Sequence, residues 1–315
     1  MRVSVVIPTY NSKGLLPACL EGLLVQDFDA SQFEVVVSDD GSTDGTEALM
    51  DDFASRFEAL GASLKYLRNE RGGAAAARNA GILAAGGEII AFTDADCVPC
   101  PGWLRAIDKC FCEHPDRMGV GGKTVSEPEK ITPFTHQVEN SLEYSYPTCN
   151  VAYRRDALMK VGMFEASFPY PGCRFLGTPD NEDWDITFKI KSLGEIGFSK
   201  DALVVHPPRP TTMRKLLTRT RNLESEFYLY ERHPELYSRS VHRHPLRVLL
   251  YHRALVQPAL KMLRFSKLTY KRPLTYLKML ALLSLQSAYI FLLTPYLTIR
   301  HLRRRKWSGP WRLPG

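Results

Sequence analysis

The first hundred residues alternate between short apolar runs and longer segments whose apolar residues recur at helical spacing. The short runs predict strands at residues 3–7, 33–37, 64–67 and 88–93. The longer segments predict helices at 14–25, in the stretch that ends at Phe57, and at 74–85. Strand, helix, strand repeated in this order favours a parallel sheet covered by helices on both faces. We therefore expect an α/β fold.

Polar side chains follow three of these predicted strands where each strand ends. They are Pro8, Thr9, Tyr10 and Asn11 after the first strand, Asp39 and Asp40 after the second, and Asp94 and Asp96 after the fourth. Ligands of parallel sheets bind at the carboxyl ends of the strands, so these residues are expected to share one site.

The residue types at this edge suit a phosphate ligand with a metal ion. Asp94 and Asp96 are able to hold a hard divalent cation that neutralises a diphosphate, although an Asp-x-Asp pair is also common in surface turns. Asp39 and Asp40 are able to accept hydrogen bonds from a base or ribose. Arg78, near the start of the helix after Gly72 and Gly73, is expected to meet phosphate oxygens.

The pattern loosens after Pro99. Strands are predicted at 118–125, 149–153, 196–198 and 203–205, and helices from Arg155 and from about Asn181 to before Gly194, with an irregular stretch at 168–179. The expected globular body therefore ends near His206.

Five short motifs in this body resemble family 2 glycosyltransferases, which have the GT-A fold. The motifs stand in the family's order and spacing: Val-Ser-Val-Val-Ile-Pro-Thr-Tyr-Asn at 3–11, Asp-Asp-Gly-Ser-Thr-Asp-Gly-Thr at 39–46, Ala-Arg-Asn-Ala-Gly at 77–81, Phe-Thr-Asp-Ala-Asp at 92–96 and Asn-Glu-Asp-Trp-Asp-Ile at 181–186. The resemblance covers roughly residues 2–206. It implies a Rossmann-like, mostly parallel sheet, with a nucleotide-sugar half at about 1–98 and an acceptor half at about 99–206.

The resemblance also implies roles for matching residues. Asp40 and the turn Pro8, Thr9, Tyr10 and Asn11 would bind the base and ribose of a UDP- or GDP-type sugar, with Asp39 supporting the loop. Asp96, assisted by Asp94 and by His206, would bind Mn²⁺ or Mg²⁺ on the diphosphate. An equally favoured interpretation of His206 is a structural histidine at a strand end that forms only a local hydrogen bond.

The implied reaction is transfer of one sugar with inversion. Asp183 would be the general base, and Glu182 is the second candidate for this role. The alternative is that these acidic residues only stabilise the N-terminus of a helix. Asn150, Trp184 and residues 168–179 are expected in the acceptor pocket. Arg219 and Arg221 lie where some relatives keep a basic element over the diphosphate. The Gln-x-x-Arg-Trp signature of processive synthases is missing, which favours single addition.

Other classes fit less well. A dehydrogenase would need a Gly-x-Gly-x-x-Gly motif after the first strand, and a nucleotidyltransferase a glycine- and basic-rich loop there; both are missing. An inactive glycosyltransferase-like scaffold is the non-enzymatic alternative, which the retained acidic residues disfavour.

Charge is divided sharply along the chain. Residues 1–205 hold 19 basic and 30 acidic side chains, whereas residues 206–315 hold 22 basic and 4 acidic ones. The second region, 207–315, is predicted to be mostly helical. Its window 279–299 carries no charge and is long enough to reach across the roughly 30 Å of a bilayer core.

We interpret the basic region as a contact with an anionic membrane surface and not with nucleic acid, whose phosphates the acidic body would repel. The expected location is the cytoplasmic face of the cell membrane, where a lipid-linked or membrane-proximal glycan would be the acceptor. In-plane or re-entrant attachment is favoured over a single span, because a span would place basic residues on the wrong side. The oligomeric state stays open.

The seven cysteines lack disulfide spacing, and no signal-peptide pattern opens the chain, so a reducing cytosol is expected. Cys97, Cys100, Cys110 and Cys112 would allow a zinc site. Their spacing is unusual for one, and plain thiols are favoured.

Overall fold

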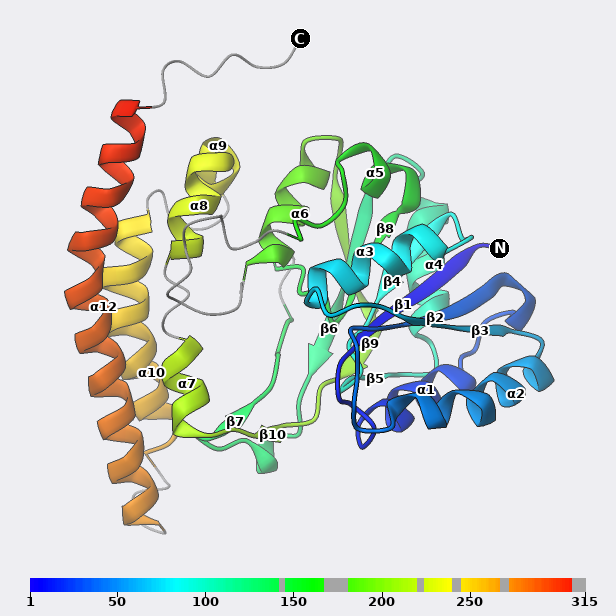
Figure 1. Cartoon of the computed structure of the whole chain (residues 1–315), viewed down its shortest axis with the longest axis horizontal. Coiled ribbons are helices and arrows are strands. Elements are labelled where there is room, and N and C mark those ends of the chain that lie inside the picture. Colours follow the sequence, from blue (N-terminus) through cyan, green and yellow to red (C-terminus); the bar gives the residue numbers. More distant parts are fainter. Residues whose placement is uncertain (142–144, 167–180, 220–223, 240–244, 267–271, 308–315) are drawn as a thin grey trace. The chain divides into compact units, whose positions relative to one another are not determined.

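The computed structural model describes residues 1–141, 145–166, 181–219, 224–239, 245–266 and 272–307. The chain forms two compact units (Figure 1). The first consists of Met1–Ile131, His136–Phe168 and Glu182–Arg209, and the second of Thr132–Thr135, Pro169–Asn181 and Pro210–Gly315.

The first unit is built on an eight-stranded sheet with the order β3-β2-β1-β4-β8-β6-β9-β5. Its strands are β1 Val3–Thr9, β2 Phe33–Asp39, β3 Ser63–Arg68, β4 Ile89–Phe92, β5 Val98–Pro99, β6 Gly119–Val125, β8 Val151–Arg154 and β9 Ile196–Val205. The pairs among β1, β2, β3 and β4, and the pair β6–β9, are parallel, whereas β8 and β5 run antiparallel to their neighbours. Two further short strands, β7 Thr135–His136 and β10 Arg209–Pro210, pair with each other.

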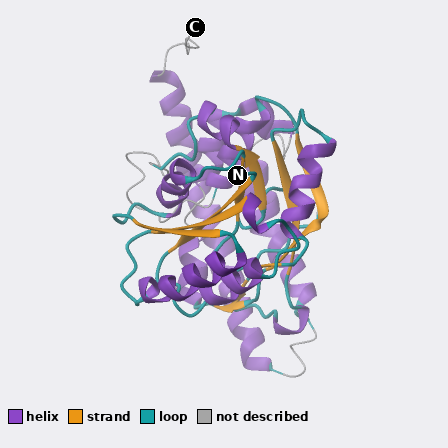
Figure 2. Cartoon of the chain, turned by 90° about the vertical axis from the view of Figure 1, so that its right-hand side faces the viewer, coloured by secondary structure: helices purple, strands orange, loops and turns teal. Residues whose placement is uncertain are grey.

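Helices cover both faces of the sheet (Figure 2). They are α1 Leu16–Leu24, α2 Met50–Leu60, α3 Ala74–Ala84, α4 Trp103–Glu113, α5 Arg155–Lys160 and α6 Glu182–Lys191. Side chains alternate along a strand, so Val5 of β1 joins a core with α1, α2 and α4, whereas Val6 joins a core with α3, α5 and α6. The predicted mostly parallel sheet with helices on both faces is confirmed.

Two details differ from the prediction. The segments 196–198 and 203–205 belong to one strand, because both pair with β6 on either side of an irregularity between Gly122 and Lys123. Helix α4 was not predicted, although Trp103, Ile107 and Phe111 recur at helical spacing and are buried.

Gly122 of β6 lies at the irregularity in the pairing of β6 with β9. A β-carbon at this position would lie 2.2 Å from the carbonyl oxygen of Ala202 and 2.4 Å from Oδ1 of Asn150. Since real atoms do not approach so closely, only glycine allows this strand pairing.

The second unit is helical, as expected for the basic region. Its helices are α7 Met213–Arg219, α8 Glu224–Arg232, α9 Pro234–Tyr237, a π-helix Arg247–Val256, α10 Gln257–Arg264 and α12 Pro273–Trp307. Ser287 Oγ of α12 donates to the Ala254 carbonyl oxygen at 2.8 Å, and Gln286 Nε2 donates to that of Leu216 at 3.1 Å. Polar side chains in the uncharged window thus attach α12 to the other helices of its unit.

Helix α12 carries the predicted membrane window. Among the described residues, Pro273–Ile299 is the one stretch long and apolar enough to cross a bilayer, a test of length and composition alone. Only 28% of its most apolar part is buried within the structure.

Candidate functional site

The turn after β1 is attached to the loop after β2. The backbone N–H of Asn11 donates to Ser42 Oγ at 2.8 Å, and the N–H of Thr43 donates to Asn11 Oδ1 at 2.8 Å. Asn11 has a φ of 49°, a left-handed conformation that asparagine tolerates. The exposed ring of Tyr10 lies beneath the guanidinium of Arg71, with 4.4 Å between the guanidinium carbon and the ring centroid.

Asp39 supports this loop from within the core. Its fully buried carboxylate accepts hydrogen bonds from Ser42 Oγ at 2.6 Å, from the Ser42 N–H at 2.8 Å and from the Tyr66 hydroxyl at 2.5 Å. Burial and the negative charge of Asp39 raise the pKa of Tyr66, so its hydroxyl stays a donor at neutral pH.

Asp40 connects the end of β2 to the loop before α3. Its carboxylate accepts hydrogen bonds from the N–H groups of Gly72 at 2.7 Å and Gly73 at 2.9 Å. Gly73 has a φ of 89°, which favours glycine there. The acidic side chain thereby fixes the loop from which α3, and with it Arg78, begins.

Arg78 of α3 lies between two carboxylates from different parts of the chain. Nη2 is 3.1 Å from Asp94 Oδ1, and Nη1 is 3.2 Å from Glu182 Oε1. Burial of the guanidinium disfavours its charge, but the two carboxylates outweigh this effect and raise the pKa of Arg78 above its ordinary value. Arg78 thus joins the end of β4 to the start of α6. The structure shows these carboxylates as its partners, where the sequence predicted phosphate oxygens.

Asp183 and Glu182 have different surroundings, although they are adjacent in the first turn of α6. Glu182 faces Arg78, whereas one oxygen of the partly exposed Asp183 accepts a hydrogen bond from the N–H of Trp184 at 2.8 Å. The ring of Trp184 packs against Phe188 one turn later, with centroids 5.6 Å apart. Arg78 therefore pairs with Glu182, the second candidate for the base, and Asp183 is not part of that ion pair.

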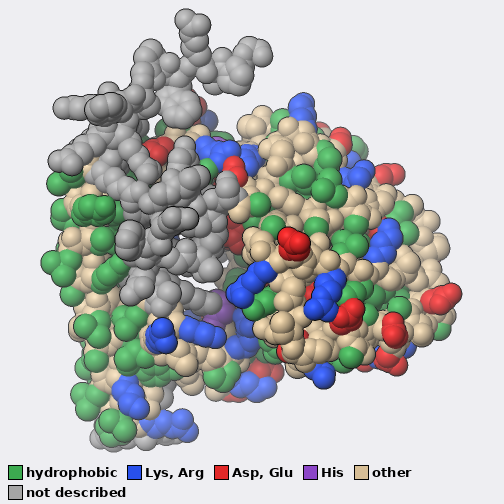
Figure 3. All heavy atoms as spheres, in the orientation of Figure 1, with side chains coloured by type: hydrophobic (Ala, Val, Ile, Leu, Met, Phe, Trp, Pro, Cys, Tyr) green, Lys and Arg blue, Asp and Glu red, His purple; other side chains and the backbone are tan. Residues whose placement is uncertain are grey.

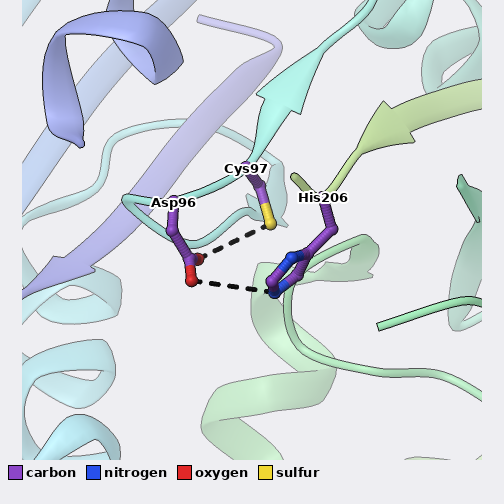
Figure 4. Close-up of side chains that lie close together, drawn as sticks. All are labelled: Asp96, Cys97 and His206. Carbon is purple, nitrogen blue, oxygen red and sulfur yellow. Dashed lines mark hydrogen bonds and ion pairs between the residues drawn. The ribbon is translucent and has the colours of Figure 1, made fainter. Parts of the chain in front are cut away.

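Asp96, which follows β4, and His206, which follows β9, lie close together (Figure 4). His206 Nε2 is 3.7 Å from Asp96 Oδ2, and Cys97 Sγ is 3.8 Å from Asp96 Oδ1. The guanidinium of Arg209 forms an ion pair with Asp96 Oδ2 as well. Within the described ranges, Asp96, Cys97 and His206 are the one cluster of three side chains whose ligand atoms lie within 4.8 Å of one another.

The ring of His206 is oriented by its own neighbour. Nδ1 lies 3.2 Å from the carbonyl oxygen of Pro207, an acceptor, so this contact is a hydrogen bond when Nδ1 carries the hydrogen. In the neutral ring, Nε2 then keeps its lone pair on the side of Asp96. This tautomer is the one found in metal-binding histidines.

The donor atoms of Asp96 and His206 fit a divalent cation. A carboxylate oxygen and an imidazole nitrogen suit Mn²⁺, and the oxygen suits Mg²⁺. Cys97 is a poorer ligand, because its hydrogen bond with Cys149 and its burial raise the pKa of its thiol and keep it protonated. The structure thus gathers two of the three predicted ligands, while Asp94 faces Arg78.

Several predicted site residues have other surroundings. Asn150 is 1% exposed, its Oδ1 accepts from Trp103 Nε1 at 2.8 Å, and its Nδ2 donates to the carbonyl oxygens of Lys123 and Ala202, both at 2.9 Å. These bonds use its amide in the core, so we do not retain it in an acceptor pocket. Residues 168–179, Arg221 and the side chain of Arg219 lie outside the described residues.

The four cysteines considered for zinc do not share one cluster. Cys110 Sγ contacts Arg117 Nη1 at 3.2 Å, and Cys112 Sγ contacts Asp108 Oδ2 at 3.7 Å. None of the four forms a disulfide, and Cys97 is the one among them that belongs to the three-side-chain cluster of the described residues.

Arg209 is the site residue that sequence reasoning missed. It follows His206 by three positions in a His-Pro-Pro-Arg-Pro stretch. The proximity of one basic residue to a predicted metal ligand was the available signal, but 22 basic residues in this region concealed it.

Known proteins resemble this chain in sequence. The family described as Glycosyl transferase family 2 matches residues 4–176. Glycosyltransferase AglE of Haloferax volcanii is 30% identical over 218 residues, which cover 66% of this chain and 67% of AglE. Poly(ribitol-phosphate) beta-N-acetylglucosaminyltransferase TarS of Staphylococcus aureus is 38% identical over 96 residues, but these cover only 30% of this chain and 16% of TarS.

Solved structures share the fold. The mannosyltransferase PcManGT of Pyrobaculum calidifontis, in complex with GDP-Man and Mn²⁺, matches with a TM-score of 0.60 and 23% identity, covering 92% of this chain and 87% of its own. TarS 1–349 of S. aureus in complex with UDP-GlcNAc matches with a TM-score of 0.55 and 22% identity, covering 82% and 78%. With a family match over more than half of its length, and with the expected fold, the chain belongs to glycosyl transferase family 2 and is a glycosyltransferase.

Proposed function

We propose that the protein transfers one sugar from a UDP- or GDP-type nucleotide-sugar to a hydroxyl group, with inversion and with Mn²⁺ or Mg²⁺. The observation that carries this proposal is the position of Asp40, Asp96 and Asp183 within one structural unit, after β2, after β4 and at the start of α6. The complexes of related folds with GDP-Man and Mn²⁺ and with UDP-GlcNAc support it.

The nucleotide would bind where the loops after β1 and β2 meet. Tyr10 offers an exposed ring for the base, while Asp39 and Asn11 hold the loops that carry it. Asp40 would accept hydrogen bonds from the base or ribose in addition to holding Gly72 and Gly73. Pro8 and Thr9 shape the end of β1.

The cation would be held by Asp96 and His206. Asp94, two residues after the end of β4, would supply a further oxygen ligand. When bound, it would offset the negative charge that builds on the departing diphosphate. The chain's own contribution is to present a carboxylate just before β5 and an imidazole ring just after β9, two strands that pair with each other.

Asp183 would accept the proton of the attacking hydroxyl. The oxygen of that hydroxyl would attack the anomeric carbon from the side opposite the diphosphate. The bond between that carbon and the diphosphate oxygen would break, so the configuration at the anomeric carbon would be inverted. Trp184, next to it and partly exposed, offers an aromatic surface for an acceptor sugar.

We further propose that residues 1–206 form the catalytic domain and that 207–315 attach it to the cytoplasmic face of a membrane, near a lipid-linked or other glycan acceptor. Hydrophobic side chains lie along α12 in Figure 3, and the exposed ones include Leu274, Leu277, Leu285, Phe291, Leu292 and Ile299. The sequence after Ile299 adds five basic residues up to Lys306, which suit anionic lipid.

A panel of nucleotide-sugars tests the donor proposal. Purified protein is expected to hydrolyse one UDP- or GDP-sugar slowly without an acceptor, only when Mn²⁺ or Mg²⁺ is present, as followed by release of the nucleoside diphosphate. Excess chelator should stop the release, and added Mn²⁺ should restore it. Release of pyrophosphate from a nucleoside triphosphate and a sugar phosphate would instead reveal a nucleotidyltransferase, and inactivity on every donor would indicate a scaffold.

Protease treatment of membranes tests the attachment. With in-plane or re-entrant attachment, a C-terminal tag should be digested in inside-out vesicles and protected in right-side-out vesicles. An N-terminal tag on a second version of the protein should behave in the same way. Digestion of the C-terminal tag only in right-side-out vesicles would establish a single span. Recovery of the protein in the soluble fraction would contradict membrane attachment.

A further inference from the structure

Asp96 already has a cationic partner in this structure, namely Arg209. The guanidinium pairs with Oδ2, the same oxygen that lies 3.7 Å from Nε2 of His206. The Asp96 side chain is 9% exposed, whereas that of Arg209 is 38% exposed. The ion pair thus satisfies a nearly buried carboxylate from its solvent side.

The backbone on both sides of this contact is restrained. The N–H of His206 donates to the Val125 carbonyl oxygen at 2.8 Å, and Ser126 Oγ donates to the His206 carbonyl oxygen at 2.7 Å. Pro207 and Pro208 connect His206 to Arg209, and Pro210 follows it. Proline fixes φ, so the segment is stiff and the side chain of Arg209 is the part that is able to move.

The guanidinium of Arg209 does not use all of its hydrogen-bond donors. Its Nε is buried and has no hydrogen-bond partner among the described residues. A buried donor without a partner is unfavourable, which makes this arrangement easier to exchange. Because 38% of its side chain is exposed, Arg209 is able to leave Asp96 for solvent.

We propose that Arg209 is a tethered counter-cation, which occupies Asp96 Oδ2 until a divalent metal ion displaces it. Two cations on one carboxylate oxygen repel each other, so guanidinium and metal compete for it. The inference rests on the proposed function in taking Asp96 and His206 as the metal ligands.

The competition has a consequence for the order of binding. The enzyme without donor should hold the metal weakly, because binding must first break the ion pair. A diphosphate brings negative charge that compensates for the second cation, so metal and donor should bind together. Between reactions, when no metal ion is bound, the ion pair with Arg209 neutralises the negative charge of Asp96.

A titration of the full-length protein with Mn²⁺ alone tests the proposal, with free Mn²⁺ measured by electron paramagnetic resonance. Arg209→Gln should bind Mn²⁺ about tenfold more tightly than the unsubstituted protein, since the competing charge is gone. Arg209→Lys, which keeps a charge, should stay close to the unsubstituted protein. Asp96→Asn should abolish the gain when combined with Arg209→Gln.

Arg56→Gln is the matched control, because Arg56 pairs with Glu21 at an exposed site and lies 40 positions before Asp96 in the sequence, and it should leave Mn²⁺ affinity unchanged. Equal or weaker binding by Arg209→Gln would overturn the proposal, as would the lack of Mn²⁺ binding by both proteins. These titrations contain no nucleotide. Donor hydrolysis without the Mn²⁺ effect therefore contradicts this inference alone, and the Mn²⁺ effect without donor hydrolysis contradicts the proposed function alone.

Discussion

Asp183→Asn is expected to lower the turnover of the donor identified by the panel by about 10²–10⁴-fold, while the donor still binds. The amide keeps the shape of the side chain and accepts the hydrogen bond from the Trp184 N–H, but it takes no proton from the acceptor hydroxyl. Initial rates with an accepted sugar or alcohol measure turnover. The shift in melting temperature caused by the nucleotide-sugar with Mn²⁺ measures donor binding.

The comparison with Glu182→Gln distinguishes the two candidate bases. Glu182 pairs with Arg78, so its substitution should alter stability and the position of α6 more than proton transfer. Asp201→Asn, at an exposed position of β9, is a control for the loss of a carboxylate elsewhere. Nearly full turnover by Asp183→Asn together with a pH-dependent loss in Glu182→Gln would move the role of base to Glu182.

The strand ends could be predicted from the sequence because each follows a short apolar run. Strand β1 buries apolar side chains on both faces of the sheet, Val3 and Val5 on one face and Val6 on the other, which is the pattern of a central parallel strand. The polar residues follow at the end of the strand. The clustering of Asp40 and Asp96 at one edge then follows from strand direction alone. Asp183 came from the family resemblance, because nothing in its local pattern separates it from Glu182.

The partners of these residues could not be predicted in the same way. Arg78 and Glu182 are 104 positions apart and meet only because α3 and α6 pack on the same face of the sheet. Asn150 resembled a polar pocket residue, yet the strands bring Trp103, Lys123 and Ala202 to its amide. Side-chain pairing across such distances depends on the register of packed elements, which a single sequence does not reveal.

The pairing also explains how so many acids coexist at one edge. Asp40 is held by backbone N–H groups, Asp94 and Glu182 share Arg78, and Asp96 pairs with Arg209. Each negative charge thus has a local donor or cation before any ligand arrives. Of the partners named for these four acids, Arg78 is the one that contacts two carboxylates, so its removal should have the largest structural effect among them.

Arg78→Met is expected to destabilise the protein by about 2–3 kcal/mol, measured by chemical denaturation with a spectroscopic probe. The substitution leaves Asp94 and Glu182 facing each other without the buried guanidinium between them. Loss of one partner of a buried ion pair typically costs about 3–5 kcal/mol, and the partial exposure of both carboxylates to water reduces that cost here. Arg78→Lys should lose less, because it keeps the charge but is unable to reach both carboxylates with a planar fork.

A second substitution separates charge from packing. If the instability of Arg78→Met arises from uncompensated carboxylates, adding Glu182→Gln should recover part of it, since one of the two negative charges then disappears. If it arises from the lost contact between the guanidinium and the ring of Phe164, whose centroid is 5.6 Å away, the added change should bring no recovery. Recovery would identify Arg78 as the electrostatic connection between the metal-side strand β4 and the helix that carries the proposed base. A stability unchanged in Arg78→Met would contradict that assignment, because the buried guanidinium would then have no net effect on two carboxylates from separate elements.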